Sequence, residues 1–250
     1  METELREAAR LLENREAILV FTGAGISTES GIPDFRGPQG VWTRLDPAEY
    51  TYQRYLSDPE HRRRRWQMAL DSPIREALPN PAHEAVVDLW KAGKLAGCVT
   101  QNIDGLHQAA GLPAEEVVEL HGTARRVACL GCSAGWPTEE VLERVRAGEA
   151  DPACPHCGGL LKAATISFGQ MMPEAAMARA YELAERADAV LSVGSTLSVY
   201  PAAFIPLEAA GRGVPLVIVN RGPTEHDRAA WVKVEGSAGE VLPHLVAAIT

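Results

Sequence analysis

Four cysteines in two close pairs are the residues of this chain whose spacing points most directly to chemistry. Cys129 and Cys132 form one C-x-x-C pair, Cys154 and Cys157 form the second, and 21 residues separate the inner cysteines. Two such pairs can surround one Zn²⁺ with four thiolates, which leaves no position for water. The spacing therefore predicts one structural zinc ion per chain. His156 lies between the second pair, but four cysteines already satisfy the ion, so we leave it out.

His121 follows the predicted strand 117–120 directly and precedes Gly122. A histidine titrates near neutral pH and can take a proton from a ribose hydroxyl. Its position at the end of a strand favours the role of catalytic base over a structural role.

The segment Gln101-Asn102-Ile103-Asp104 places two amides and one carboxylate after another predicted strand, 95–100. Such groups can bind the carboxamide of nicotinamide and the hydroxyls of a ribose. The alternative is a turn, capped by Asn or Asp, that opens the next helix. The segment alone does not decide between them.

A glycine loop follows the apolar strand 17–21, which ends in Thr22-Gly23-Ala24-Gly25. Glycines at this point let backbone N–H groups approach a pyrophosphate, although a tight structural turn would also use them. Further on, Asp34-Phe35-Arg36 lies among Gly and Pro residues, which favours a ligand-holding loop. Thr28 stands where a dehydrogenase fingerprint has its third glycine, and no acidic strand end follows about 20 residues on. We expect a dinucleotide site that is not built for hydride transfer.

The elements that must position these residues alternate between strands and helices. Apolar runs predict strands at 17–21, 95–100, 117–120, 189–193, 216–219 and 232–234. Helical periodicity and caps predict helices at 2–14, from Asn80-Pro81 to Gly93, after Pro173, at 201–210 and after the capping box Ser237-x-x-Glu240. This alternation is typical of an α/β fold with a parallel sheet covered by helices on both faces.

Five polar loops each come directly after a predicted strand. The ends of parallel strands share one edge of a sheet, and ligands bind in the crevice at that edge. We therefore expect these segments to converge: Gly23, Gln101 to Asp104, His121, Gly194 to Thr196, and Asn220.

The composition is that of an ordinary soluble protein, with 46% hydrophobic and 23% charged residues. A net charge of −9 argues against nucleic acid as the main partner, because neutralising phosphates requires a basic face. The charged first residues predict no signal peptide, and the longest apolar region is interrupted by Gly and Pro, so no membrane span is expected. Paired cysteines suited to metal rather than disulfides favour a reducing, cytoplasmic compartment.

Taken together, these motifs resemble the sirtuin family over nearly the whole chain. The resemblance rests on 23–27, 31–37, 101–104, 121–122, both C-x-x-C pairs, Phe168-Gly169, 194–196 and Asn220. It implies an NAD-dependent protein-lysine deacetylase that moves the acetyl group to ADP-ribose and releases nicotinamide. It also implies a Rossmann-type NAD-binding domain formed by 1–37, 80–122 and 166–250. A small domain would combine the helical insert 38–79 with the zinc-ribbon module 123–165.

The resemblance also implies roles for individual residues. His121 would act as the base, and Asn102 and Asp104, with Gln101 and Ile103, would hold the nicotinamide end. Phosphates and ribose would contact the loops at Gly23, Ala24, Gly25, Ser27, Gly194, Ser195 and Thr196, and the adenosine would lie near Asn220 and Ala238. Phe35 would shield the reactive carbon, Arg36 would order its loop, and Asp34 would be a further residue of the cofactor site. An acyl-lysine peptide would add as a strand beside Ile166, Phe168, Gly169 and Val199.

Two positions depart from the family pattern. Gln170 replaces the Glu that usually follows Phe-Gly, which we expect to alter peptide preference and not the chemistry. Members that remove succinyl or malonyl groups carry Tyr-x-x-Arg in the helical insert, where this chain has Trp66 and Ala69. The missing arginine favours a short neutral acyl group such as acetyl.

Two other functions remain open from the sequence. An ADP-ribosyltransferase would cleave NAD in the same way and use a different acceptor. A non-catalytic zinc-ribbon adaptor would bind NAD as a signal without turnover. A nucleic-acid-binding zinc module is disfavoured because 123–165 lacks a dense basic cluster.

Overall fold

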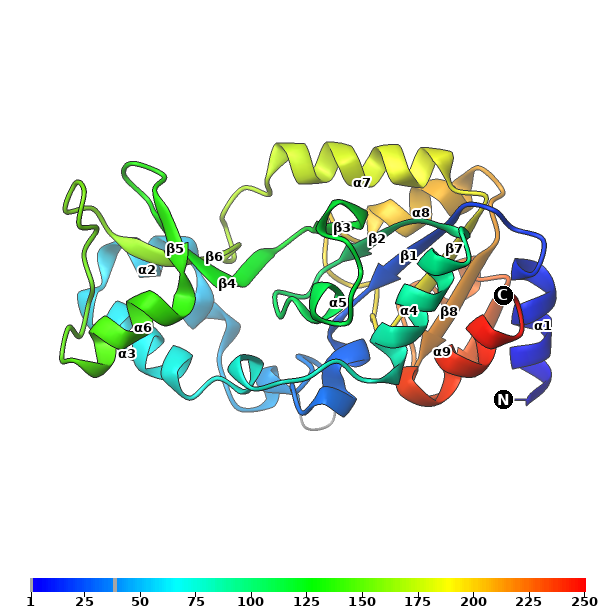
Figure 1. Cartoon of the computed structure of the whole chain (residues 1–250), viewed down its shortest axis with the longest axis horizontal. Helices are drawn as coiled ribbons and strands as arrows, with labels where there is room; N and C mark the ends of the chain where they lie inside the picture. The colour runs from blue at the N-terminus through cyan, green and yellow to red at the C-terminus, as the bar shows by residue number, and fades with distance from the viewer. Residues whose placement is uncertain (1, 38–39) are drawn as a thin grey trace.

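The computed structural model describes residues 2–37 and 40–250 as an elongated molecule with a large and a small sheet (Figure 1). Met1 and residues 38–39, the first two of the predicted insert, lie outside the described residues. No helix of the described part of the chain is long and apolar enough to cross a membrane.

The large sheet has six parallel strands in the order β3-β2-β1-β7-β8-β9. Their bounds are β1 (Ile18–Thr22), β2 (Leu95–Thr100), β3 (Val117–Glu119), β7 (Ala189–Val193), β8 (Leu216–Asn220) and β9 (Val232–Glu235). The strand order reverses direction between β1 and β7, which is the switch point where ligands bind in such sheets. The predicted parallel sheet is confirmed.

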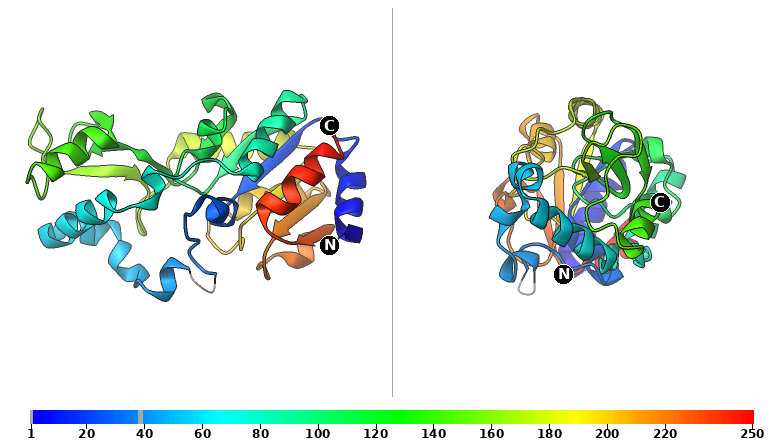
Figure 2. Two further views of the ribbon diagram at one scale, coloured as in Figure 1. Left: turned by 60° about the horizontal axis from the view of Figure 1, so that its bottom comes forward. Right: turned by 90° about the vertical axis from the view of Figure 1, so that its left-hand side faces the viewer.

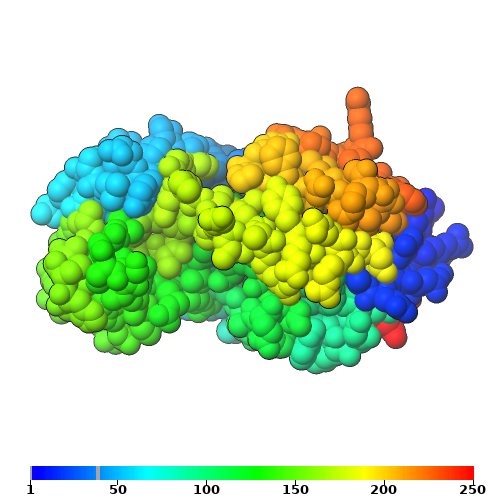
Figure 3. Space-filling view, turned by 90° about the horizontal axis from the view of Figure 1, so that it is seen from above, coloured from blue at the N-terminus to red at the C-terminus, as the bar shows by residue number. Residues whose placement is uncertain are grey.

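Helices cover both faces of this sheet (Figures 1 and 2). On one face lie α1 (Glu2–Leu12), α4 (Pro81–Lys91) and α9 (Ala238–Ala247), and on the other lie α7 (Glu174–Arg186) and α8 (Phe204–Gly211). Seen from above, the yellow segment of α7 covers its face of the sheet (Figure 3). Within β1, Val20 packs toward the first group of helices and Phe21 toward the second, and both are fully buried.

The small sheet is antiparallel, with the order β5-β4-β6. It comprises β4 (Gly122–Cys129), β5 (Gly135–Pro137) and β6 (Leu161–Thr165). Helix α6 (Thr138–Arg146) follows β5 and packs on this sheet, whereas the short α5 (Leu106–Ala109) lies between β2 and β3 in the chain. From the insert, α2 (Tyr52–Ser57) and α3 (Pro59–Leu70) pack beside this sheet. Trp66 of α3 joins Val127 and Leu142 in a separate buried core.

The predicted ends of two helices need correction. The final helix starts after Ser237, but the Ser237 hydroxyl donates to the Glu240 carboxylate at 2.7 Å and caps no backbone N–H. The helix predicted from Pro201 begins at Phe204, because a turn takes up 201–203 and the Ala203 N–H bonds to the Val199 carbonyl.

Candidate functional site

The loops after β1 and β7 are joined to each other at the switch point, beside the end of β8. The N–H of Gly23 donates to the Val193 carbonyl at 3.0 Å, and the N–H of Gly25 donates to the Gly194 carbonyl at 2.8 Å. The N–H of Gly194 bonds in turn to the Val219 carbonyl at 2.9 Å. The loops after β1 and β7 therefore meet at one edge next to the end of β8, as the sequence predicted.

The two glycines after β1 are required by this loop packing. A Cβ on Gly25 would lie 2.7 Å from the Gly194 Cα, and a Cβ on Gly23 would lie 2.8 Å from the Gly194 carbonyl oxygen. Gly194 itself has φ of 62°, a conformation that glycine adopts without strain. The structure thus supplies a packing reason for both glycines, and contact with a pyrophosphate stays a prediction.

The segment after β2 is folded onto the glycine loop by buried hydrogen bonds. The Asn102 amide donates to the Gly23 carbonyl and to the Ser27 hydroxyl, both at 3.1 Å. The Ser27 hydroxyl donates to the Asp104 carboxylate at 2.8 Å, and the other oxygen of that carboxylate caps the Leu106 N–H at 2.9 Å. Asp104 therefore both caps α5, which was the alternative interpretation, and joins a network with Ser27 and Asn102.

His121 is held at the same edge through one ring nitrogen. Its Nδ1 lies 2.8 Å from the Gln101 carbonyl, which can only accept, so Nδ1 carries the proton. This leaves Nε2 as the ring nitrogen that can take up a proton. Burial lowers the pKa of His121, and the hydrogen bond to Gln101 partly opposes that shift. The ring is therefore a neutral base at physiological pH.

Two buried histidines behind this network were not among the predicted site residues. His83 Nε2 lies 3.4 Å from the Ser27 hydroxyl, and His107 Nε2 lies 3.0 Å from the Thr22 hydroxyl. The two rings meet edge to face at 5.1 Å. Burial lowers the pKa of His83 to about 4 and that of His107 to about 3. The only signal for His83 in the sequence is its position three residues after Asn80, where its ring completes a capping box.

The predicted phosphate and adenosine contacts lie at the ends of β7 and β8 and at the start of α9. The Gln101 amide donates to the Ser195 hydroxyl at 2.9 Å, and the Thr196 hydroxyl lies 2.8 Å from that of Ser198. Asn220 ends β8, and its amide donates to the Gly222 carbonyl at 3.0 Å. Ala238 is a buried first residue of α9. Their contacts with a nucleotide stay predictions.

An aromatic cluster links the loop at Phe35 to the segment at Phe168. The rings of Phe35 and Trp42 are 5.2 Å apart, and Trp42 lies 5.3 Å from Tyr50 and 5.8 Å from Phe168. Sequence reasoning did not assign Trp42 to the site. Asp34 accepts the Gly37 N–H at 2.7 Å and so shapes this loop itself.

For Arg36, the residue after Phe35, the ordering role stays a prediction. Its side chain is exposed, and within residues 2–37 and 40–250 its guanidinium makes no hydrogen bond. The contacts that shape this loop in the described residues come from Asp34 and the aromatic cluster.

The predicted substrate segment lies directly against His121. The Ile166 N–H donates to the His121 carbonyl at 2.8 Å. Phe168 bonds instead to the helical insert, through the Tyr50 carbonyl at 3.2 Å and the Tyr52 N–H at 2.9 Å. The Gln170 side chain accepts the Ser167 N–H at 3.2 Å. An added peptide strand must therefore use the groups that these contacts leave available, including those of Gly169.

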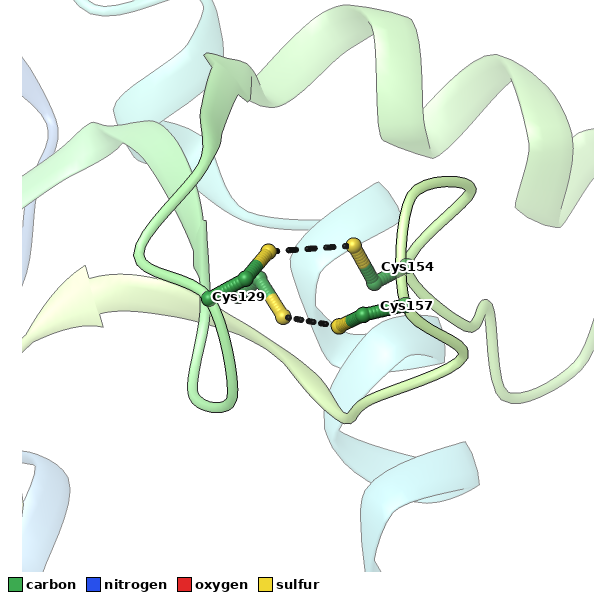
Figure 4. Close-up of side chains that lie close together, drawn as sticks. Cys129, Cys154 and Cys157 are labelled. Atoms are coloured by element: carbon green, nitrogen blue, oxygen red, sulfur yellow. Dashed lines mark hydrogen bonds between the residues drawn. The ribbon is translucent and has the colours of Figure 1, made fainter.

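The four predicted zinc ligands lie together at the far end of the small sheet (Figure 4). All four sulfur atoms lie within 4.8 Å of one another, with Cys129 to Cys157 at 3.5 Å and Cys132 to Cys154 at 3.7 Å. A tetrahedral Zn–S distance of about 2.3 Å requires sulfurs about 3.8 Å apart, so these residues fit the ion. They are positioned to bind one zinc ion, and no site remains for water.

The backbone around the cysteines also favours the ion. The Gly131 N–H donates to Cys129 Sγ at 3.3 Å. Burial raises the pKa of Cys129, but the N–H groups of Cys132 and Gly131 and the thiols of Cys157 and Cys154 outweigh burial and lower it to about 6. One backbone N–H lowers the pKa of each of Cys132 and Cys157, but hydrogen bonds with the other thiols outweigh it, raising that of Cys132 and raising that of Cys157 to about 12. The thiolate form that binds zinc is therefore accessible at neutral pH for Cys129.

The protein has a parallel sheet with helices on both faces, polar loops at its switch point and a four-cysteine module. These features are typical of a nucleotide-binding α/β protein with a structural metal centre. Residues 23–201 match the Sir2 family. The chain is 44% identical over 237 residues to NAD-dependent protein deacetylase 2 of Streptomyces coelicolor, covering 94% of this chain and 98% of that protein. The chain belongs to the Sir2 family, so the predicted sirtuin resemblance is confirmed.

Solved structures agree with this assignment. A Sir2 enzyme studied for its mechanism and regulation superimposes with a TM-score of 0.90 at 41% identity, covering 100% of this chain and 98% of that one. A Sir2 complex with a p53 peptide and NAD⁺ gives a TM-score of 0.86 at 35% identity, with 97% of both chains covered.

Proposed function

We propose that this chain is an NAD-dependent protein-lysine deacetylase. The observation that carries the proposal is the neutral His121 ring, which is fixed through Nδ1 at the edge where the loops after the parallel strands converge. Relatives named NAD-dependent protein deacetylases support the same activity. In the overall reaction, NAD, acetyl-lysine and water give nicotinamide, lysine and acetylated ADP-ribose.

Within this site the chain's own groups orient and move protons. NAD supplies the ribose that receives the acetyl group. Nε2 of His121 takes a proton from a ribose hydroxyl, while Asn102 and Asp104, held by Ser27, bind the nicotinamide end. The loops at Gly23 and Ser195 bind the phosphates, Phe35 excludes water from the reactive carbon, and Asn220 and Ala238 contact the adenosine.

We also propose that the chain forms two domains. Residues 1–37, 80–122 and 166–250 form the NAD-binding domain, and 38–79 with 123–165 form the small domain. The hydrogen bond from the Tyr55 hydroxyl to the Leu161 carbonyl, at 2.6 Å, supports joining the insert to the zinc module. Acyl-lysine proteins are the proposed partners, and the cytoplasm is the proposed compartment because the four cysteines are placed for metal and not for disulfides.

Product analysis tests this function. The chain is incubated with NAD and an acetyl-lysine peptide, and the products are identified by mass spectrometry. We expect free lysine peptide, nicotinamide and acetylated ADP-ribose in equal amounts. ADP-ribosylated peptide would instead establish the transferase, and NAD binding without nicotinamide release would establish the adaptor.

A further inference from the structure

Hydrogen bonds connect His121 and the start of β4 with the segment that follows β2. One of them is the bond between His121 Nδ1 and the Gln101 carbonyl described above. Further along the same two segments, the N–H of Ala124 donates to the Ile103 carbonyl at 2.8 Å. These bonds fix the proposed base relative to the residues proposed to bind the nicotinamide end.

Arg125, an exposed residue of β4, makes the third contact between the two segments, and it does so with its side chain. Its Nε donates to the Asp104 carbonyl at 2.8 Å, and in the described part of the chain that carbonyl accepts no other hydrogen bond. The stem of Arg125 lies over Gly105, where an added Cβ would be 3.2 Å from the arginine Cγ. Gly105 has φ of 69°, so the turn after Asp104 uses a residue that suits this conformation and leaves room for the arginine.

The irregular pairing of β4 explains why Arg125 can reach this carbonyl. β4 pairs with β6 at Gly122 and again from Val127 on, and its register shifts between these two residues. The residues in between are therefore not paired with β6, and they bond to the segment after β2 instead.

Arg125 also acts on a second group. Burial raises the pKa of the Glu119 carboxyl, and the charge of Arg125 opposes that shift. Among residues 2–37 and 40–250 Arg125 forms no ion pair, so this attraction acts over a longer distance than the bond to Asp104. A test of Arg125 must therefore separate its hydrogen bond from its charge.

We propose that Arg125 is a positioning residue for the reaction. Through the Asp104 carbonyl it fixes the segment that binds the nicotinamide end relative to His121, and in this respect the inference rests on the proposed function. Asp104 is then held on two sides, because Ser27 and the Leu106 N–H bond to its carboxylate and Arg125 bonds to its carbonyl. Arg125 itself takes part in no bond making or proton transfer.

Three substitutions separate the hydrogen bond from the charge. Glutamine carries an amide N–H₂ as many bonds from the backbone as Nε of arginine, so Arg125→Gln keeps a donor and removes the charge. Arg125→Met has a side chain of the same reach and no donor. Arg126→Met is the matched control, because Arg126 is also exposed but lies where β4 pairs with β5.

Steady-state kinetics test the positioning role. The KM for NAD, the KM for an acetyl-lysine peptide and the inhibition constant of added nicotinamide are measured for wild type and the three variants. We expect Arg125→Met to raise the KM for NAD and the nicotinamide constant at least about fivefold, the effect of losing one hydrogen bond, and to change the peptide KM by less than about twofold. Arg125→Gln should recover most of this loss, and Arg126→Met should behave as wild type.

Three kinetic results would overturn the proposal. In the first, Arg125→Met has the same constants as Arg126→Met. In the second, Arg125→Gln is no better than Arg125→Met, which would assign the effect to the charge. In the third, the peptide KM rises as much as the KM for NAD, which would indicate a general loss of structure.

A measurement without NAD separates this inference from the proposed function. Hydrogen exchange of the ligand-free protein is followed in residues 101–106 and, for comparison, in α9. We expect faster exchange in 101–106 for Arg125→Met than for wild type and Arg125→Gln, with α9 unchanged. Equal exchange in all of these proteins would overturn the positioning role even in an active enzyme. A wild type that releases no nicotinamide would refute the deacetylase, while faster exchange in Arg125→Met would still support the role of Arg125.

Discussion

His121 combines a fixed proton on Nδ1 with a free lone pair on Nε2, and both follow from one contact with the Gln101 carbonyl. Replacing it with alanine removes the base, so we expect His121→Ala to lower kcat for deacetylation by at least roughly 10²-fold. Nicotinamide release and peptide deacetylation are measured together. Near-normal deacetylation in a folded His121→Ala protein would refute the role.

The same residue sets the acidic limb of the pH profile. Because the folded pKa of His121 lies below 6.5, the neutral base is present at pH 7 and is lost only as the pH falls through that lower value. We expect kcat/KM of wild type to decline below pH 6.5 and the residual activity of His121→Ala to lack this limb. An acidic limb of equal position in both proteins would assign it to another group.

For single residues, the sequence predicted which polar side chains belong to the candidate site, but it did not predict which residues they contact. The residue types at 101–104 and 121 predicted the chemistry, because polar side chains directly after strands must share one edge. The aromatic contacts of Trp42 with Phe35 and Phe168 could not be predicted. Phe168 lies more than a hundred residues from Trp42 along the chain, and no local pattern encodes that pairing.

Among the elements, the turn after β1 depends on the absence of a side chain at Gly25. A methyl group there would lie 2.7 Å from the Gly194 backbone, so Gly25→Ala must separate two bonded loops. We expect a loss of about 1–3 kcal/mol in the free energy of unfolding, measured by urea denaturation. Gly211→Ala, where a Cβ meets nothing within 4 Å, is the control and should be neutral or stabilising. Equal effects of the two substitutions would contradict the packing argument.

We expect the folding of the small sheet to depend on the zinc ion. We expect about one zinc per chain by elemental analysis, and we expect Cys132→Ser to lose most of it, because one of four ligands is removed. Cys98 is buried in β2, away from the four, so Cys98→Ala should retain full zinc. Hydrogen exchange should increase across β4 and β6 in the metal-free protein. A metal-free protein with unchanged protection there would contradict the structural role.

Periodicity predicted the large sheet well because each strand is an apolar run buried on both faces, as in β1 and β7. The strands β4 and β5 and helix α6 were not predicted individually. Their shape follows from the spacing of the cysteines and from packing on Trp66, which local hydrophobic patterns do not report.

For the whole molecule, the buried histidine pair predicts acid sensitivity. The folded pKa values of about 4 for His83 and about 3 for His107 lie below the ordinary value of 6.5. Unfolded chains therefore take up protons that the folded protein does not, and stability falls as the pH drops from 6.5 toward 3. Urea midpoints measured between pH 7 and pH 4 should show this decline.

Two variants assign the effect. His107→Gln should flatten the dependence of the urea midpoint on pH, because one depressed group is removed. His244→Gln changes an exposed histidine of α9 and should leave the dependence as in wild type. A slope that is the same in His107→Gln and wild type would show that other groups cause the acid sensitivity.

The small sheet begins and ends beside the reaction site. β4 starts at Gly122, next to His121, and β6 stops at Thr165, next to Ile166, while the cysteines hold the opposite ends of the same two strands. Zinc at the far ends of β4 and β6 would therefore fix the positions of their near ends, which adjoin the proposed base and the predicted substrate segment. A partly demetallated preparation should then be a mixture of competent and idle molecules, with turnover falling in proportion to the zinc content and KM unchanged.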